Sequence, residues 1–258
     1  MIPRRDLRET GTSDADRAVS DMIAFVLVFA IIIGSVGLLS TVGFQAMTDY
    51  QEGEQLRNAE RAMVSLADNF NDVLRYDGVE QRDGELSLRG GTVAIGGGGT
   101  TVNVTADGND DPLGDTDLGT FTYEHDSTRI AYEGGGVIRS TDSGSVVAKR
   151  PQLRCNTDGS GPDTAIVSFV TVDAAERAIQ SDGGQEFTIS KDGSPVRRVE
   201  EYSDATVTVH VDTDYERAWA SNPTYGDWDV EERNNPVELR CQDVDRLVIT
   251  VVPVDINY

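Results

Sequence analysis

One uncharged apolar stretch near the N-terminus limits how this chain can fold more than any other feature. Residues 22–44 read MIAFVLVFAIIIGSVGLLSTVGF, in which only Gly, Ser and Thr interrupt the apolar side chains. At a helical rise of about 1.5 Å per residue, a stretch of this length crosses a hydrocarbon layer of about 30 Å. It therefore predicts one membrane-spanning helix, and the membrane is the first expected partner.

The charges on either side of this stretch predict its orientation. Four arginines precede it, whereas three acidic residues follow it before the next basic residue, Arg57. Basic residues favour the cytoplasmic side, so we expect a single-pass protein of the cell membrane with its C-terminal part outside the cell. The apolar stretch is longer than the core of a secretory signal, which disfavours cleavage after it.

The boundary between the polar leader and the apolar stretch has a motif of its own, because residues 16–21 read DRAVSD. This resembles the class III signal peptide of haloarchaeal type IV pilins, in which a charged and a small residue precede the cut and the apolar helix is retained. The resemblance implies a processing site of Arg17, Ala18 and Val19. Prepilin peptidase would cut after Ala18 and remove a leader of residues 1–18.

The resemblance covers roughly residues 14–75 and departs from the family at Asp21, where proline is common. This departure suggests a minor pilin or a pseudopilin-like subunit. Other pilin-like subunits are then expected partners, with Asp21 pairing with the freed N-terminal amine of a neighbour. Small residues such as Gly34, Gly37 and Gly43 would let the helices approach closely. Alternatively, the helix is a lone anchor, and Asp21 is solvated or caps the first helical turn.

The helical pattern continues beyond the apolar stretch. Residues 45–76 contain no proline, and apolar residues recur at spacings of seven, three, four and four, as one stripe of an amphipathic helix does. These residues are Leu56, Met63, Leu66, Phe70 and Leu74. We expect one long helix over residues 19–76, whose second half supports a globular head.

The remaining residues, 77–258, change to short β-like runs separated by turn residues, which predicts a mostly antiparallel β head and an α+β fold. The expected strands cover residues 84–88, 92–95, 101–105, 120–124, 129–133, 165–172, 186–190, 206–211 and 247–252. Residues 174–180 are expected to form a short helix. Trp219 and Trp228 are expected to anchor a long loop, and residues 96–99, all glycine, form a turn.

Charge excludes one class of partner. The formal net charge is −23, and only two of the 22 basic residues are lysines. Such a chain is not expected to bind nucleic acid. The acidic, lysine-poor composition resembles that of proteins from salt-loving archaea, in which high salt screens the self-repulsion.

The two cysteines, Cys155 and Cys241, lie in the part expected outside the cell. An oxidising compartment favours one disulfide, which would stabilise the head by roughly 4 kcal/mol. Two buried free thiols are the alternative. No metal site is expected, because the sequence has neither a CxxC motif nor a close Cys/His pair.

Two further features of the head suggest surface chemistry. Asn103 begins an Asn-Val-Thr sequon and is a candidate for N-glycosylation. Residues 107–117 are rich in Asp and Asn, and they are expected to form a solvated acidic loop; the alternative is a calcium loop, although the EF-hand spacing is missing.

No catalytic set is recognisable. There is no GxSxG motif, and His125 and His210 do not lie in any nucleophile pattern. We expect no enzyme and no cofactor. The leading hypothesis is a pilin-like subunit assembled into a surface structure for adhesion or assembly. The main alternative is an uncleaved single-pass anchor that displays a binding head, and a tethered hydrolase ranks last.

Overall fold

The computed structural model describes residues 13–108, 110–157, 159 and 161–258. They divide into two compact units, one ending at Glu54 and the other running from Gln55 to Tyr258. Helix α1 (Ser13–Arg75) contributes residues to both units. Three of the four arginines that precede the apolar stretch, Arg4, Arg5 and Arg8, lie outside the described residues.

The first unit is the apolar part of α1. Its large apolar side chains from Val19 to Phe44 are all 52 to 72% exposed. Within the described residues, α1 is the one helix long and apolar enough to cross a membrane. The predicted long N-terminal apolar helix is confirmed, and its exposed side chains form a large apolar surface.

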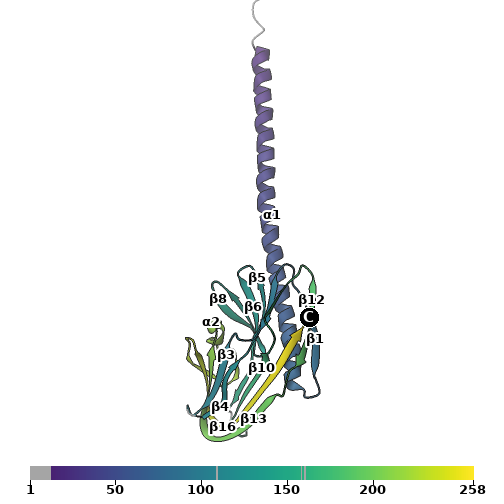
Figure 1. Ribbon diagram of the computed structural model, residues 1–258. Helices are drawn as coiled ribbons and strands as arrows, with labels where there is room; N and C mark the ends of the chain where they lie inside the picture. Colours follow the sequence, from purple (N-terminus) through teal and green to yellow (C-terminus); the bar gives the residue numbers. More distant parts are fainter. Residues whose placement is uncertain (1–12, 109, 158, 160) are drawn as a thin grey trace, which may run out of the picture. The chain divides into compact units, whose positions relative to one another are not determined.

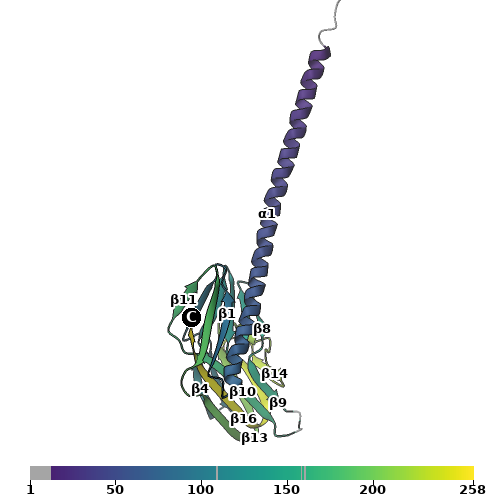
Figure 2. The ribbon, with the colours of Figure 1, turned by 90° about the vertical axis from the view of Figure 1, so that its right-hand side faces the viewer.

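The second unit contains two β-sheets, drawn in Figures 1 and 2. In the described part of the chain the larger sheet has ten strands, with the central order β14-β9-β10-β16-β13-β3-β4; β12 and β15 pair with β16, and β1 pairs with β12. These strands are β1 (Gln81–Ser87), β3 (Thr101–Ala106), β4 (Asp110–Asp117), β9 (Gln152–Asn156), β10 (Thr164–Val172), β12 (Gly184–Lys191), β13 (Val196–Asp212), β14 (Tyr225–Gly226), β15 (Asp229–Glu232) and β16 (Val237–Asn257).

The smaller sheet has the order β11-β2-β5-β6-β7-β8. Its strands are β2 (Thr92–Gly96), β5 (Thr120–His125), β6 (Thr128–Glu133), β7 (Gly136–Thr141), β8 (Gly144–Lys149) and β11 (Arg177–Gln180). All of its pairs are antiparallel, whereas the larger sheet contains two parallel pairs, β10 with β16 and β9 with β14. The predicted mostly antiparallel head and the α+β fold are therefore confirmed.

The C-terminal part of α1 is a core element of this unit. The apolar stripe expected from the sequence is buried at Met63, Leu66, Phe70 and Leu74, against side chains from both sheets. The Phe70 ring stacks on Tyr132 of β6 with centroids 4.3 Å apart. Burying side chains of this size stabilises the fold by about 1.5 to 3 kcal/mol each, so the helix is fixed by packing as well as by propensity.

A second apolar core lies around β10, β13 and β16, beside the short helix α2 (Glu216–Trp219). Both Trp219 and Trp228 belong to it and are at most 2% exposed. Their expected role as packing anchors is confirmed. The segment that contains them is not a featureless loop, because α2, β14 and β15 interrupt it.

Two local predictions were wrong. Residues 174–180 do not form a helix: Arg177–Gln180 is strand β11, which pairs with β2, for example through Ile179 and Val93. The acidic residues expected in a loop belong largely to strand β4, Asp110–Asp117, which pairs with β3. Residues 177–180 form a strand because they pair with β2, which is distant in sequence, whereas the acidic segment forms a hairpin with β3, the strand directly before it; in both cases pairing overrides the local composition.

Candidate functional site

The predicted processing site lies within α1. Residues 17–19 are helical, Val19 is exposed, and the side chains of Arg17 and Ala18 lie outside the described residues. Asp21 is also exposed. The cut after Ala18 and the pairing of Asp21 with a neighbouring amine stay predictions.

The three glycines expected at an assembly surface do not share one face of the helix. A methyl group added at Gly34, Gly37 or Gly43 would meet no atom within 4 Å. At about 100° of rotation per residue, Gly34 and Gly37 lie on one side of α1, and Gly43 lies opposite Gly34. Any close helix approach that uses Gly34 and Gly37 therefore leaves Gly43 on the other side.

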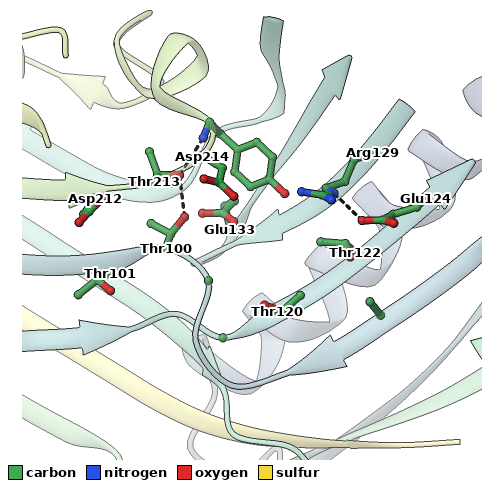
Figure 3. A pocket seen from close by; sticks show the side chains of 14 residues that line it. Thr100, Thr101, Thr120, Thr122, Glu124, Arg129, Glu133, Asp212, Thr213 and Asp214 are labelled. Atoms are coloured by element: carbon green, nitrogen blue, oxygen red, sulfur yellow. Dashed lines mark hydrogen bonds and ion pairs between the residues drawn. The ribbon is translucent and has the colours of Figure 1, made fainter. Parts of the chain in front are cut away.

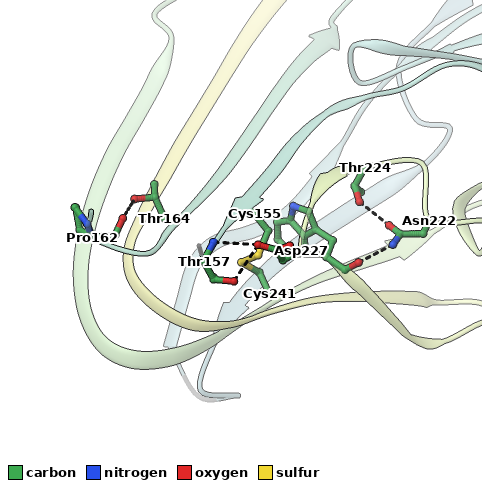
Figure 4. Close-up of a disulfide and its surroundings, with 9 residues drawn as sticks. Cys155, Thr157, Pro162, Thr164, Asn222, Thr224, Asp227 and Cys241 are labelled. Atoms are coloured by element: carbon green, nitrogen blue, oxygen red, sulfur yellow. Dashed lines mark hydrogen bonds between the residues drawn. A yellow bond between two sulfur atoms is a disulfide. The ribbon is translucent and has the colours of Figure 1, made fainter. Parts of the chain in front are cut away.

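The predicted disulfide is present in the head. Cys155 of β9 and Cys241 of β16 are bonded and fully buried, so the alternative of two free thiols is wrong (Figure 4). The bond joins the two strands that flank β10. Beside it, Gly226 has a φ of +81°, and an added Cβ would lie 1.8 Å from the Cys155 carbonyl oxygen, so only glycine fits this approach.

The expected surface sites lie together on β3 and β4. Asn103 is partly buried, and its Nδ2 donates to Asp115 Oδ1 at 3.2 Å and to Asp111 Oδ1 at 3.5 Å. Glycosylation at Asn103 stays a prediction, and the modification would have to displace these two hydrogen bonds. Among the described residues, no group of three or more His, Cys, Asp or Glu side chains is placed to hold a metal ion.

The structure reveals a polar pocket that the sequence did not predict. It has a volume of about 310 Å³ and lies where the smaller sheet meets the ends of β3 and β13 (Figure 3). Its inner wall is formed by buried polar residues, and its rim by exposed ones. The inner residues are Thr100, Thr122, Glu133, Thr213 and Tyr215, and the rim includes Gly99, Arg129, Asp212 and Asp214.

Hairpin geometry places Glu133 in this pocket. Glu133 ends β6 and pairs with Gly136 across a two-residue turn formed by Gly134 and Gly135, both with positive φ. Such turns favour glycine, because both central residues need a left-handed backbone. The Asn71 side chain of α1 donates a 2.9 Å hydrogen bond to the Gly135 carbonyl, which fixes the turn against the helix.

Glu133 has unusual electrostatics. It is only 4% exposed, and its Oε2 atom has no hydrogen-bond partner among the described residues. Burial raises the pKa of Glu133 to about 8; Thr100 and Trp219 oppose this rise, and the charge of Asp214 adds to it. At neutral pH the carboxyl group is therefore mostly protonated and acts as both donor and acceptor.

The rest of the pocket is held by its own interactions. Thr100 Oγ1 and Thr213 Oγ1 lie 2.7 Å apart, and Arg129 Nε donates to Glu124 Oε1 at 2.5 Å (Figure 3). Burial, with a contribution from the charge of Glu133, raises the pKa of Tyr215 to about 12, although nearby Arg129 opposes the shift. Tyr215 therefore stays neutral over the physiological range.

Sequence inspection missed this pocket because no motif marks it. Its lining comes from residues between Ala94 and Tyr215, which lie on two separate sheets and meet only in the folded head. One local signal was present: Glu133 follows the apolar run Ile130–Tyr132 and precedes three consecutive glycines, a pattern that predicts the end of a strand at a tight turn.

Fold and site together define a class: a chain with one N-terminal helix capable of spanning a membrane, followed by a disulfide-bonded, mostly antiparallel β head. The chain belongs to a family of unknown function, DUF7289, whose family model matches residues 17–257. No curated protein and no solved structure matches it.

Proposed function

We propose that this protein is a type IV pilin-like subunit, of the minor or pseudopilin-like kind, which prepilin peptidase cuts after Ala18 and which assembles through its apolar helix into a surface structure. The observation that carries the proposal is the exposed apolar surface of α1, where every large apolar side chain from Val19 to Phe44 is more than half exposed in the described structure. Lipid would cover them before assembly, and neighbouring helices would do so afterwards.

The family match covers both parts of the chain on which the proposal depends. The match begins at residue 17, beside the proposed cut, and includes both the apolar helix and the head. Processing would remove residues 1–18, of which only Arg17 and Ala18 lie within the match. The head would then stay outside the cell, where its buried disulfide is chemically suited to an oxidising compartment.

A stripe of small residues suggests which side of the helix would pack. Ala30, Gly34, Gly37 and Thr41 follow one another at spacings of four, three and four, so they lie on one side of α1. Close contact between helices in lipid depends on such residues, because small side chains let two backbones approach. Gly43 lies outside this stripe, so a substitution there serves as a control for substitutions within the stripe.

We expect Gly34→Ile with Gly37→Ile to reduce assembly severalfold, because the added side chains would separate the helices. Gly43→Ile, which adds the same kind of apolar side chain elsewhere, should leave assembly nearly unchanged. Chemical cross-linking in isolated membranes, followed by gel analysis of the higher-order species, measures the difference. A wild-type chain that yields only monomers, or a Gly43 variant as impaired as the double variant, would contradict the proposal.

The second candidate function is an uncleaved single-pass anchor that displays the head for recognition outside the cell. The polar pocket around Glu133 favours it, because a built pocket in the head suits a displayed binding module. The two candidates differ at the N-terminus, since this one keeps residues 1–18 on the mature chain.

A further inference from the structure

The pocket around Glu133 has the construction of a binding site for a small polar molecule. Its walls come from the smaller sheet through β2, β5 and β6, and from the larger sheet through β3 and the segment after β13. Its volume of about 310 Å³ is at the lower end of the range for ligand pockets. A ligand of one small ring would fill it.

The inner wall carries an unsatisfied polar atom. Glu133 Oε2 is buried and has no hydrogen-bond partner in the part of the chain that the structure describes. Leaving such an atom unpaired costs about 1 to 3 kcal/mol, so a ligand that hydrogen-bonds to it gains that interaction. Glu133 also lines the pocket, within reach of a ligand placed there.

The chemistry of the lining limits the class of ligand. An anion would meet the carboxyl groups of Glu124, Asp212 and Asp214, with only Arg129 to attract it, and Arg129 is already paired with Glu124. Metal ions are disfavoured because no described cluster supplies three suitable ligands. Anions and metal ions are therefore disfavoured, which leaves neutral polar molecules and organic cations.

The hydrogen-bonding groups of the pocket favour a neutral molecule that carries several hydroxyl groups. Thr100, Thr120, Thr122 and Thr213 supply hydroxyl groups that both donate and accept, and Arg129 adds donors at the rim. The hydroxyl groups of a sugar have the same double capacity. Tyr215 adds a buried aromatic side chain to the inner wall, against which the apolar face of a ring can pack.

We propose that this pocket binds a single neutral pyranose ring, with Glu133 and Thr122 bonding to its hydroxyl groups from within and Arg129 bonding from the rim. The inference does not depend on pilin-type processing, because the pocket lies entirely in the second unit of the chain. It gives the head a recognition function in either candidate role.

The test uses the full-length protein in phospholipid nanodiscs, free of sugar-based detergent. Saturation-transfer NMR would be recorded with a panel of glucose, galactose, mannose, rhamnose and N-acetylglucosamine, each titrated into the millimolar range. We expect saturable binding of at least one sugar. Thr122→Val, which keeps the side-chain shape and removes the hydroxyl, should weaken that binding about fivefold, equivalent to one lost hydrogen bond.

Two further variants test a second pocket residue and provide a control outside the pocket. Arg129→Gln changes an exposed rim residue, should not disturb the fold, and should weaken binding severalfold. Thr250→Val makes the same replacement as Thr122→Val at a partly buried position outside the pocket and should change nothing. Absence of saturable binding to every sugar, or binding that survives both Thr122→Val and Arg129→Gln unchanged, overturns the proposal.

Discussion

Replacing Glu133 by glutamine should make the head more stable at pH 8, and the gain should almost vanish at pH 5. Burial raises the pKa of Glu133 from 4.5 to about 8, so the folded protein holds a proton that the unfolded chain releases. Glutamine is permanently neutral and similar in shape. The variant therefore avoids the cost of placing an ionised carboxylate in the buried inner wall of the pocket.

The sign follows from proton linkage. Stability falls with increasing pH wherever the folded state binds more protons than the unfolded state, which for Glu133 is the interval from pH 4.5 to about 8. The stabilisation is complete below pH 4.5, decreases through this interval, and is lost above it. At about 1.4 kcal/mol per pH unit, the wild type loses up to about 5 kcal/mol relative to the variant.

The measurement is the free energy of unfolding in urea at several pH values for both proteins, at constant salt. A matched control is Glu200→Gln, which removes a carboxyl group from an exposed position on β13 and should change stability by less than about 0.5 kcal/mol. If the free energies of unfolding of Glu133→Gln and the wild type differ by the same amount at pH 5 and pH 8, the prediction that Glu133 is protonated in the folded protein is wrong.

The second large effect concerns the disulfide. Changing both Cys155 and Cys241 to alanine should lower the free energy of unfolding by about 4.5 kcal/mol, because the bond joins residues separated by 86 positions and restricts the unfolded chain. Alanine is chosen because serine would leave hydroxyl groups without partners in a fully buried site. The fold itself should survive, since both apolar cores remain.

Urea unfolding of the wild type, the wild type with reductant, and the double variant distinguishes the possible causes. We expect the reduced wild type and the double variant to unfold at similar, lower urea concentrations than the oxidised protein. Equal midpoints for the oxidised wild type and the double variant would show that the bond does not stabilise the head.

Local patterns in the sequence were sufficient for the helix and for much of the sheet. The apolar run from Met22 to Phe44 and the stripe ending at Leu74 specify α1 through nearest neighbours along the chain. Likewise, each expected strand overlaps a strand of the structure, because alternating apolar residues mark a half-buried strand. These features depend on periodicity alone.

What could not be predicted depends on partners distant in sequence. Strand β11 forms because residues 177–180 pair with β2, about 85 positions earlier in the chain. The pocket requires Glu133 of the smaller sheet to lie near Thr100 and Tyr215, which adjoin paired strands of the larger sheet, and no spacing in the sequence predicts this. Charge and composition indicated an acidic surface but not a buried, protonated carboxyl.

The central proposal is pilin-type processing, and its most direct test is the mass of the N-terminal peptide of the membrane-associated protein. Cells that contain prepilin peptidase would be compared with cells that lack it. The proposal predicts a mature chain that begins at Val19 and is lost without the peptidase. A chain that keeps Arg4 to Arg17 in both strains would contradict it and favour the uncleaved anchor.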